Sequence, residues 1–232
     1  MTARSTAIEL LWGRPVPPTR GPRPTLRLEA ITAAGIELAD AGGLAAVTMQ
    51  RVAESLGVTK MALYRYVPGK DELVALMTDH ALGVPPQLPS GGWRAGLDAW
   101  ARHMFARFSA HPWTLEATVG SRPIGPNELD WMERATAALT GTGLTGPQIL
   151  DVAATLTGHV RMVAQQGAAV PESAVERHMA ATIGALLAER AERYPALTAA
   201  LASPEGQDRA LDFGLSCILT GVEALIGSSP DS

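Results

Sequence analysis

The chain contains a single cysteine, Cys217, among its 232 residues. One cysteine forms no internal disulfide bond, so the sequence predicts a protein of the reducing cytoplasm, with Cys217 as a small buried apolar residue. We find no apolar run near the roughly 18 residues that a membrane span needs. The segment "AIELLW" near the start is too short for a signal peptide. We therefore expect no membrane partner.

Motifs of catalysis and of metal binding are also scarce. The five histidines are scattered without the spacing of a metal site, and no G-x-S-x-G motif or catalytic Cys/His pair occurs. The segment "GTGLTG" at 141–146 does fit the G-x-G-x-x-G pattern of dinucleotide-binding loops. It follows a helical pattern instead of a strand, so we interpret it as a turn between helices. The sequence predicts no enzyme, no cofactor and no metal site.

Positive charge is concentrated at the N-terminus, although the net charge of the chain is −4. Residues 1–28 carry five arginines and one acid, whereas residues 84–232 carry ten basic and fifteen acidic residues. This distribution favours a polyanionic partner at the front of the chain only. A bias toward arginine in the composition is the alternative, because the chain has only two lysines.

Apolar residues recur at helical spacing, and no alternating pattern of useful length indicates a strand, so we expect an all-α fold. Residues 1–24, with the proline-rich "GRPVPPTRGPRP", are expected to be a flexible basic arm. Residues 25–83 and 84–232 are expected to form two domains, with a hinge at "GVPPQLPSGG". The expected helices span 28–41, 48–56, 59–67, a stretch after Gly69, 93–110, 127–140, 146–167, 172–193 and 206–227.

The expected helices at 48–56 and 59–67 are joined by a tight turn at Gly57, which is the plan of a helix-turn-helix. Val58 and Leu63 are placed to form a hydrophobic staple, so Leu63 is expected to point into the core. A helix-turn-helix places its second helix in the DNA major groove. Many helix hairpins share this spacing, and ordinary core packing of the tyrosines and methionine is the alternative.

With Leu63 directed inward, the helical period places Met61 and Arg65 on the opposite side, toward the groove. Arg65 is suited to a guanine edge, and Met61 to a thymine methyl group. Other side chains are suited to phosphate oxygens, either at the helix N-terminus or beyond it. These are Thr59, Lys60, Tyr64, Tyr66 and Lys70.

The segment "TMQRVAESLGVTKMALYRYVPGKDELVALM" resembles the DNA-binding domain of the tetracycline-repressor (TetR) family. The shared features are a capping threonine, "VAxxLGV", "LYxY", a short turn with proline, a lysine and an acidic helix start. The match covers residues 25 to about 82. It implies a dimeric, all-α repressor that binds a DNA operator and whose larger C-terminal domain binds a small-molecule effector.

The resemblance also implies roles for individual residues. Thr48 would hold a phosphate, and Gln50 would approach the groove. Tyr64 and Lys70 would grip the DNA backbone. Gly69 departs from the serine or asparagine that family members commonly carry there as a helix cap.

The segments "WRAGLDAWARHMFARFSAHPW" and "GPNELDWMERATAAL" resemble the C-terminal domain of the tetracycline-repressor subgroup. Polar tips occur here among large apolar groups, which is the mixture that an apolar cavity with a few orienting groups needs. Packing in the core is the alternative for each of them. The candidate ligand-binding residues are Trp100, His103, Met104, Trp113, Asn127, Trp131, His159, Met162 and Gln165.

The last expected helix, 206–227, is apolar on two sides. A stripe that includes Leu215 and Val222 is expected to pack within its own domain. Gly214 and Gly221 are expected on a second face, against a partner helix. With the helix at 146–167, this face predicts a homodimer through a four-helix interface. A fully buried helix in a monomer is the alternative.

Together these features predict a ligand-responsive repressor that leaves a palindromic operator when a small, mostly apolar molecule binds. Two alternatives remain open: a constitutive DNA-binding regulator without a ligand, and a small-molecule enzyme on this fold.

Overall fold

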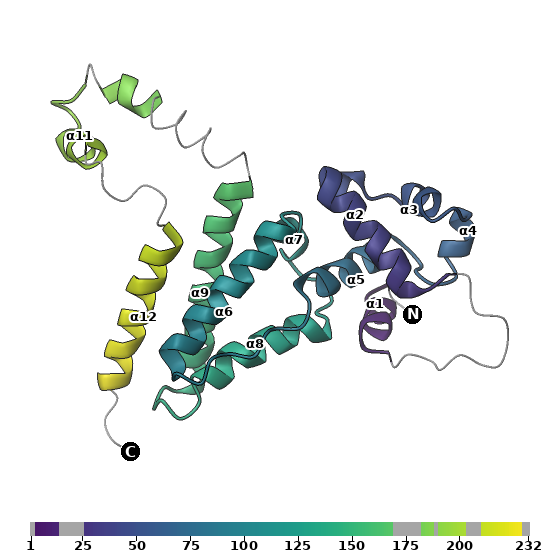
Figure 1. Ribbon diagram of the computed structural model, residues 1–232, viewed down its shortest axis with the longest axis horizontal. Helices are drawn as coiled ribbons and strands as arrows, with labels where there is room; N and C mark the ends of the chain where they lie inside the picture. The colour runs from purple at the N-terminus through teal and green to yellow at the C-terminus, as the bar shows by residue number, and fades with distance from the viewer. Residues whose placement is uncertain (1–2, 14–25, 169–181, 188–189, 203–209, 229–232) are drawn as a thin grey trace.

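The computed structural model describes residues 3–13, 26–168, 182–187, 190–202 and 210–228 (Figure 1). All regular elements in these ranges are helices, as the sequence predicts. The labelled helices are α1 (Ala3–Trp12), α2 (Leu28–Ala46), α3 (Met49–Ser55), α4 (Lys60–Leu63), α5 (Lys70–Leu82), α6 (Trp93–Ala110), α7 (Thr114–Ala117), α8 (Pro126–Ala138), α9 (Gly146–Ala168), α11 (Pro195–Ala202) and α12 (Ala210–Ser228). Residues 182–187 are helical as well.

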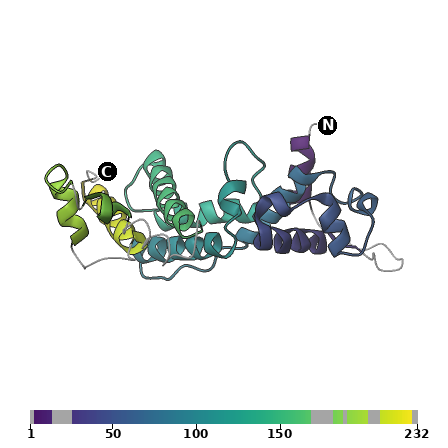
Figure 2. The ribbon, with the colours of Figure 1, turned by 90° about the horizontal axis from the view of Figure 1, so that it is seen from above.

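The helices form two bodies side by side (Figures 1 and 2). The N-terminal body contains α1 to α5, and the C-terminal body contains the helices from α6 onward. Each body has its own cluster of buried apolar side chains. Trp113, which follows α6 in the chain, belongs to the cluster of the N-terminal body. The two cores therefore meet along α5, α7 and α8.

The prediction of a flexible arm is wrong for Ala3–Trp12, because these residues form α1. This helix packs on α5, and Ala7 is buried there. The indole N–H of Trp12 donates to the carbonyl of Ile124, 3.0 Å away, just before α8. Helical spacing of Ala7, Leu10 and Leu11 was the missed signal. The proline-rich segment 14–25 lies outside the described residues.

The first expected helix ends where the sequence predicts. Gly42 and Gly43 have non-helical backbone angles, and Gly43 has φ of 71°. A positive φ is easily adopted only by glycine, so the pair interrupts α2. After this break the chain makes one more short helical turn, which ends at Ala46, and then enters α3.

The helix-turn-helix is present, with a shorter second helix than expected. Thr48 Oγ1 accepts a hydrogen bond from Arg51 N at 3.2 Å, and Thr59 Oγ1 accepts one from Ala62 N at 3.3 Å. Both threonines therefore cap helices. α4 ends at Leu63 instead of Val67. The residue before a proline avoids the helical region, and Pro68 follows Val67, so the last residues form turns.

α5 begins without a side-chain cap at Gly69. A Cβ atom added at Gly69 would lie 2.8 Å from Glu72 Oε2, which is the end of a flexible side chain that can move aside. Farther along, Leu73, Leu76 and Met77 are buried. Sterics at residue 69 therefore do not require glycine there.

In the C-terminal body, the helix expected at 93–110 coincides with α6, and α8 and α9 agree within one or two residues. The segment "GTGLTG" forms the turn between α8 and α9, with positive φ at Gly141 and Gly143. The short α7 and α11 were not predicted. Most of the helix expected at 172–193 lies outside the described residues.

α12 differs from expectation at two of its residues, while residues 206–209 of the expected helix lie outside the described residues. Cys217 is exposed instead of buried. Gly214 faces its own domain, because an added Cβ would lie 2.1 Å from His159 Cε1. The window Ala210–Gly227 is also long and apolar enough to cross a membrane by length and composition, and most of it is exposed. In the sequence, Asp212 and Glu223 interrupt this apolar run, so no membrane span was expected there.

Candidate nucleic-acid interface

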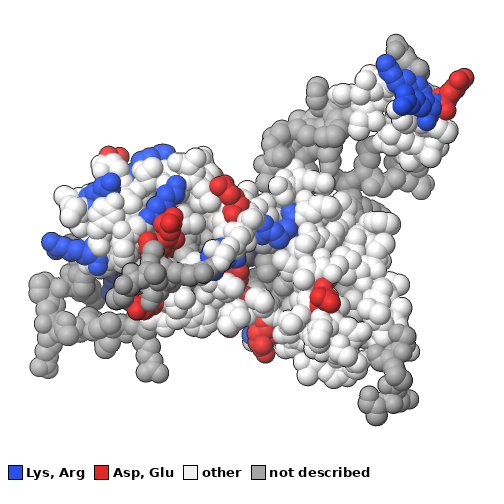
Figure 3. All heavy atoms as spheres, turned by 180° about the vertical axis from the view of Figure 1, so that it is seen from behind, with Lys and Arg blue, Asp and Glu red and all other residues white. Residues whose placement is uncertain are grey.

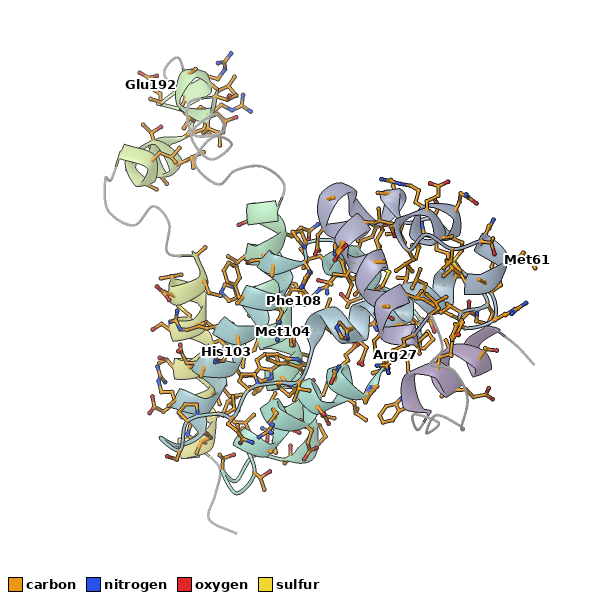
Figure 4. All side chains as sticks on the ribbon, turned by 45° about the vertical axis from the view of Figure 1, so that its right-hand side comes forward. Arg27, Met61, His103, Met104, Phe108 and Glu192 are labelled. Carbon is orange, nitrogen blue, oxygen red and sulfur yellow. The ribbon has the colours of Figure 1, made fainter. Side chains whose placement is uncertain are left out.

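The helix-turn-helix lies at the outer end of the N-terminal body, far from α12 (Figure 1). In α4, Leu63 is fully buried, whereas Met61 is 71% exposed. Figure 4 shows Met61 projecting outward from this end of the molecule. Arg65 is exposed as well. The predicted split between an inward Leu63 and outward Met61 and Arg65 is confirmed.

The aromatic residues after α4 have unequal environments. Tyr64 is 37% exposed, and the Lys60 ammonium lies 5.6 Å from its ring centroid, a cation–π contact. Tyr66 is half-buried and packs against the N-terminal core. Core packing, the alternative to a DNA contact, therefore accounts for much of the Tyr66 ring. Tyr64, in contrast, lies on the surface.

Apart from the half-buried Tyr66, the residues expected to contact DNA are exposed, and two of them, Gln50 and Lys70, donate hydrogen bonds within the protein. Gln50 Nε2 donates to Glu54 Oε1 at 2.7 Å, which orients the amide along α3. Lys70 Nζ donates to the carbonyl of Leu44 at 2.9 Å. An ammonium carries three N–H donors, so two remain for another acceptor. Lys70 thus joins α5 to the segment that enters α3.

Charge is distributed unequally over the molecule. In the space-filling view, blue and red atoms cluster over the N-terminal body, whereas the C-terminal body is largely white (Figure 3). A mostly uncharged surface offers little attraction to a polyanion. On this face most of the basic groups suited to phosphates therefore lie on the N-terminal body, apart from one blue group at the far end of the C-terminal body (Figure 3).

Two side-chain clamps join the bodies. Asp40 Oδ1, near the end of α2, accepts a hydrogen bond from Trp113 Nε1 at 2.7 Å and pairs with His111 Nδ1 at 2.8 Å. Asp79, near the end of α5, accepts from Asn127 Nδ2 and from the backbone N–H of Glu128, both at 3.1 Å.

The Asp79 clamp has an electrostatic cost. Burial raises the pKa of the Asp79 carboxyl above its ordinary value, and the two hydrogen bonds from α8 offset only part of this effect. The Asp79 carboxylate also lies at the N-terminus of α8, where the helix dipole favours a negative charge. Movement of α8 against α5 would therefore expose or bury this carboxylate.

A half-buried arginine continues this junction into α9. Arg161 donates to the carbonyl of Leu115 at 2.6 Å and to Thr118 Oγ1, and its guanidinium lies 5.4 Å from the Phe108 ring centroid. Burial and the nearby charge of Arg122 lower the pKa of Arg161. α9 is thus connected to α7, which packs against α5.

The nine candidate ligand-binding residues do not come together around one opening. Trp100 and Trp131 pack edge to face in the core, and Trp100 Nε1 donates to the carbonyl of Trp131 at 2.9 Å. Trp113 and Asn127 belong to the interbody clamps. The remaining residues differ in exposure: Met104 is buried, His159 is half-buried, and His103, Met162 and Gln165 are exposed.

The pockets described in the structure lie elsewhere. They have volumes of about 630, 530 and 480 Å³, and none of the nine candidates lines them. The largest pocket lies against α5 in the N-terminal body. Sequence reasoning missed it because its walls come from four separated segments.

Comparison with known proteins connects both bodies to one family. Residues 31–77 match the family model of bacterial regulatory proteins of the tetR family, and residues 85–226 match that of the tetracyclin repressor-like C-terminal domain. The HTH-type transcriptional repressor DrrR1 of Streptomyces coeruleorubidus is 37% identical, over 94% of this chain and 85% of that protein. An HTH-type transcriptional regulator of Saccharopolyspora erythraea is 30% identical, over 94% of this chain and 92% of its own length.

Solved structures agree with this assignment. Apo ActR from Streptomyces coelicolor matches with a TM-score of 0.77 at 25% identity, over 90% of this chain and 100% of that one. ActR in complex with actinorhodin matches with a TM-score of 0.75 at 28% identity, over 88% and 99%. With a helix-turn-helix in one body and a matching helical domain in the other, the chain belongs to the tetR family of bacterial regulatory proteins.

Proposed function

We propose that the protein is a transcriptional repressor that binds a palindromic operator as a homodimer and leaves it when a small, mostly apolar molecule binds. The observation that carries the DNA-binding part is the α4 surface, where Met61 and Arg65 are exposed beside a fully buried Leu63. An exposed methionine and arginine on a short, well-anchored helix are suited to base edges in the major groove.

The proposed contacts divide into two groups. Base edges are contacted by Gln50 of α3, Met61 of α4 and Arg65, which follows α4. All three side chains are exposed. The others hold phosphates and set the register of the protein on DNA. These are Thr48, Thr59, Lys60, Tyr64, Tyr66 and Lys70.

We place the effector in the C-terminal body, among the residues named for it in the sequence. The support is the similarity to ActR, whose structures include complexes with actinorhodin and with (S)-DNPA. In the present structure the indoles of Trp100 and Trp131 are packed and hydrogen-bonded. An effector that enters there therefore has to separate α6 from α8, which favours a different arrangement of the helices.

The clamps provide a route from that region to DNA. α8 holds Asp79 of α5, and α5 carries Lys70, which contacts the segment leading into α3. A displacement of α8 therefore acts on α5 and on the spacing of the two helix-turn-helix units in a dimer. Successive major grooves on one face lie about 34–36 Å apart, so a changed spacing weakens binding.

We place the dimer interface on α9 and α12. The exposed surface of α12 includes Phe213 (73%) and Leu225 (45%), and that of α9 includes Leu150 and Met162. Exposed apolar area of this kind marks an interaction surface. We propose that a second copy covers it, instead of a membrane, and that the protein acts in the cytoplasm as a regulator without enzymatic activity.

Selection from a pool of random DNA duplexes tests the proposal. We expect the full-length protein to enrich a palindrome with two half-sites, and the purified duplex to bind one dimer. Enrichment of a site without two-fold symmetry would contradict the dimeric repressor. An operator complex that persists in the presence of every cell-extract fraction would favour the constitutive regulator.

A further inference from the structure

Two cationic side chains from different helices converge on the end of α2. Arg51 Nη1, from α3, donates a hydrogen bond to the carbonyl of Ala46 at 2.9 Å, and Lys70 Nζ, from α5, donates one to the carbonyl of Leu44 at 2.9 Å. Both carbonyls belong to the last turn of α2, from which the chain leads into α3 (Figure 1). Lys70 is among the DNA contacts proposed above, whereas Arg51 has no role there.

Arg51 lies on the side of α3 that faces away from the core of the N-terminal body. Met49, Val52 and Ala53 form the buried face of this helix. Arg51 is exposed on the opposite side, next to Gln50. The first helix of a helix-turn-helix crosses the DNA backbone, while the second helix enters the major groove. The guanidinium of Arg51 therefore belongs to the element that meets phosphates.

No ion pair among the described residues neutralises the charge of Arg51. The carboxylate of Glu54, three residues farther along α3, accepts a hydrogen bond from Gln50 Nε2 at 2.7 Å. Within the part of the chain that the structure describes, no carboxylate pairs with Arg51 or with Lys70. A guanidinium has five N–H donors and an ammonium has three, so each group keeps donors for an external anion.

The hydrogen bond to Ala46 also restrains the long side chain of Arg51 before DNA arrives. A side chain that is already restrained loses less conformational freedom when it binds. The planar guanidinium also matches the geometry of a phosphate, to which it can donate two parallel hydrogen bonds. The end of α2 thus holds two restrained cations ready for the DNA backbone.

We propose that Arg51 is a further phosphate-binding residue, which together with Lys70 holds the DNA backbone where α2 leads into α3. This inference deepens the proposed function and rests on DNA binding by the helix-turn-helix. The alternative is a purely structural role, in which Arg51 only satisfies the carbonyl of Ala46 at the end of α2. A phosphate contact releases counterions from DNA and a structural hydrogen bond does not, so the salt dependence of binding separates the two roles.

The decisive variant is Arg51→Gln, which removes the charge but keeps an amide donor for the carbonyl of Ala46. Fluorescence anisotropy measures the binding of a labelled operator duplex between about 50 and 200 mM KCl. The slope of log affinity against log salt concentration should decrease in magnitude by about one for each protomer bound. Affinity at the lower salt concentration should fall at least about tenfold, with unchanged preference among single-base variants of the operator.

Two further variants serve as controls. Arg51→Lys keeps the charge and should retain the slope of the wild type. Arg190→Gln is the matched control in the C-terminal body, because Arg190 is also an exposed arginine that donates to a backbone carbonyl, that of Leu186. It should change neither the slope nor the affinity. Because Arg51 is exposed, its substitution should leave the melting temperature of the protein unchanged.

A random-sequence duplex gives the same readout without an operator, since backbone contacts do not depend on sequence. If the wild type binds every duplex equally, the operator proposal fails, and the slope on random DNA still decides the role of Arg51. A wild-type slope in Arg51→Gln on both duplexes would overturn the inference and leave Arg51 with the structural role alone. A wild type without affinity for any duplex would overturn both proposals.

Discussion

Arg65 is the side chain on which sequence preference at one base pair depends in the proposed complex. Its exposure next to buried Leu63 leaves the guanidinium free to approach a base edge. Arg65→Ala should weaken operator binding by about 1–3 kcal/mol and relax the preference at one base pair in each half-site. Fluorescence anisotropy with the selected operator and its single-base variants measures both effects.

The control for Arg65 is Arg193→Ala, because Arg193 is an exposed arginine in the distant C-terminal body. It should leave affinity and preference unchanged. If Arg65→Ala lowers affinity equally for all DNA sequences, then Arg65 contacts the backbone and another residue reads the base.

Asp79 makes the junction between the bodies sensitive to pH. Its folded-state pKa is raised by burial above the ordinary value of 3.8. The folded state therefore holds the proton more tightly than the unfolded state. The stability that this proton contributes is present at low pH and is lost as the pH rises from about 3.8 through the raised pKa.

Asp79→Asn removes this titration while keeping the size of the side chain. As the pH rises above 3.8, the unfolding free energy of the wild type should therefore fall relative to that of the variant. Denaturant unfolding at several pH values measures this difference. A difference that stays constant over that range would show that Asp79 keeps its ordinary pKa in the folded protein.

At the scale of elements, α1 is a structural helix of the N-terminal body, because Ala7 is buried against α5 and Trp12 is bonded to Ile124. Deleting residues 1–12 should lower the melting temperature, since it uncovers apolar surface on α5. Trp12→Phe is the milder variant: it keeps an aromatic side chain, smaller than the indole, and removes the N–H hydrogen bond, worth about 0.5–1.5 kcal/mol. An unchanged melting temperature in the deletion variant would mean that α1 does not stabilise the fold.

The long helices were predictable from the sequence because their buried positions repeat over several turns. α6 and α9 show such a period, and the Gly42–Gly43 pair marks the break in α2. Shorter elements such as α7 have too few residues for a period to appear. Their position depends on contacts with distant segments, as the hydrogen bond from Arg161 to Thr118 illustrates.

The candidate sites differed in predictability for a related reason. Leu63 and Met61 follow from local geometry, because a staple fixes one face of a short helix and thereby the other. Trp100 and Trp131 have the composition of a cavity lining, but their indoles pack against each other. Helical spacing shows which side faces inward. It does not show whether the interior holds a side chain or a ligand.

At the scale of the whole molecule, operator recognition requires two helix-turn-helix units at a fixed distance. A single α4 offers few base contacts, and a palindromic operator matches the two-fold symmetry of a dimer. The exposed apolar residues of α9 and α12, among them Phe213, are the surface on which we propose that this dimer forms. DNA affinity and self-association should therefore change together.

Gly221 tests this coupling, because it is exposed and an added Cβ would meet nothing within 4 Å in the protomer. Leucine also has a higher helix propensity than glycine, so Gly221→Leu should preserve α12. In the dimer, the new side chain would crowd the partner, at a cost of about 1–3 kcal/mol. Sedimentation equilibrium should show a weaker dimer, circular dichroism should show unchanged helicity, and operator affinity should fall in parallel with dimerisation.

Gly214→Leu should instead destabilise the protomer, because its Cβ would lie 2.1 Å from His159 Cε1. A Gly221→Leu protein that remains dimeric and binds its operator normally would place the interface on another surface.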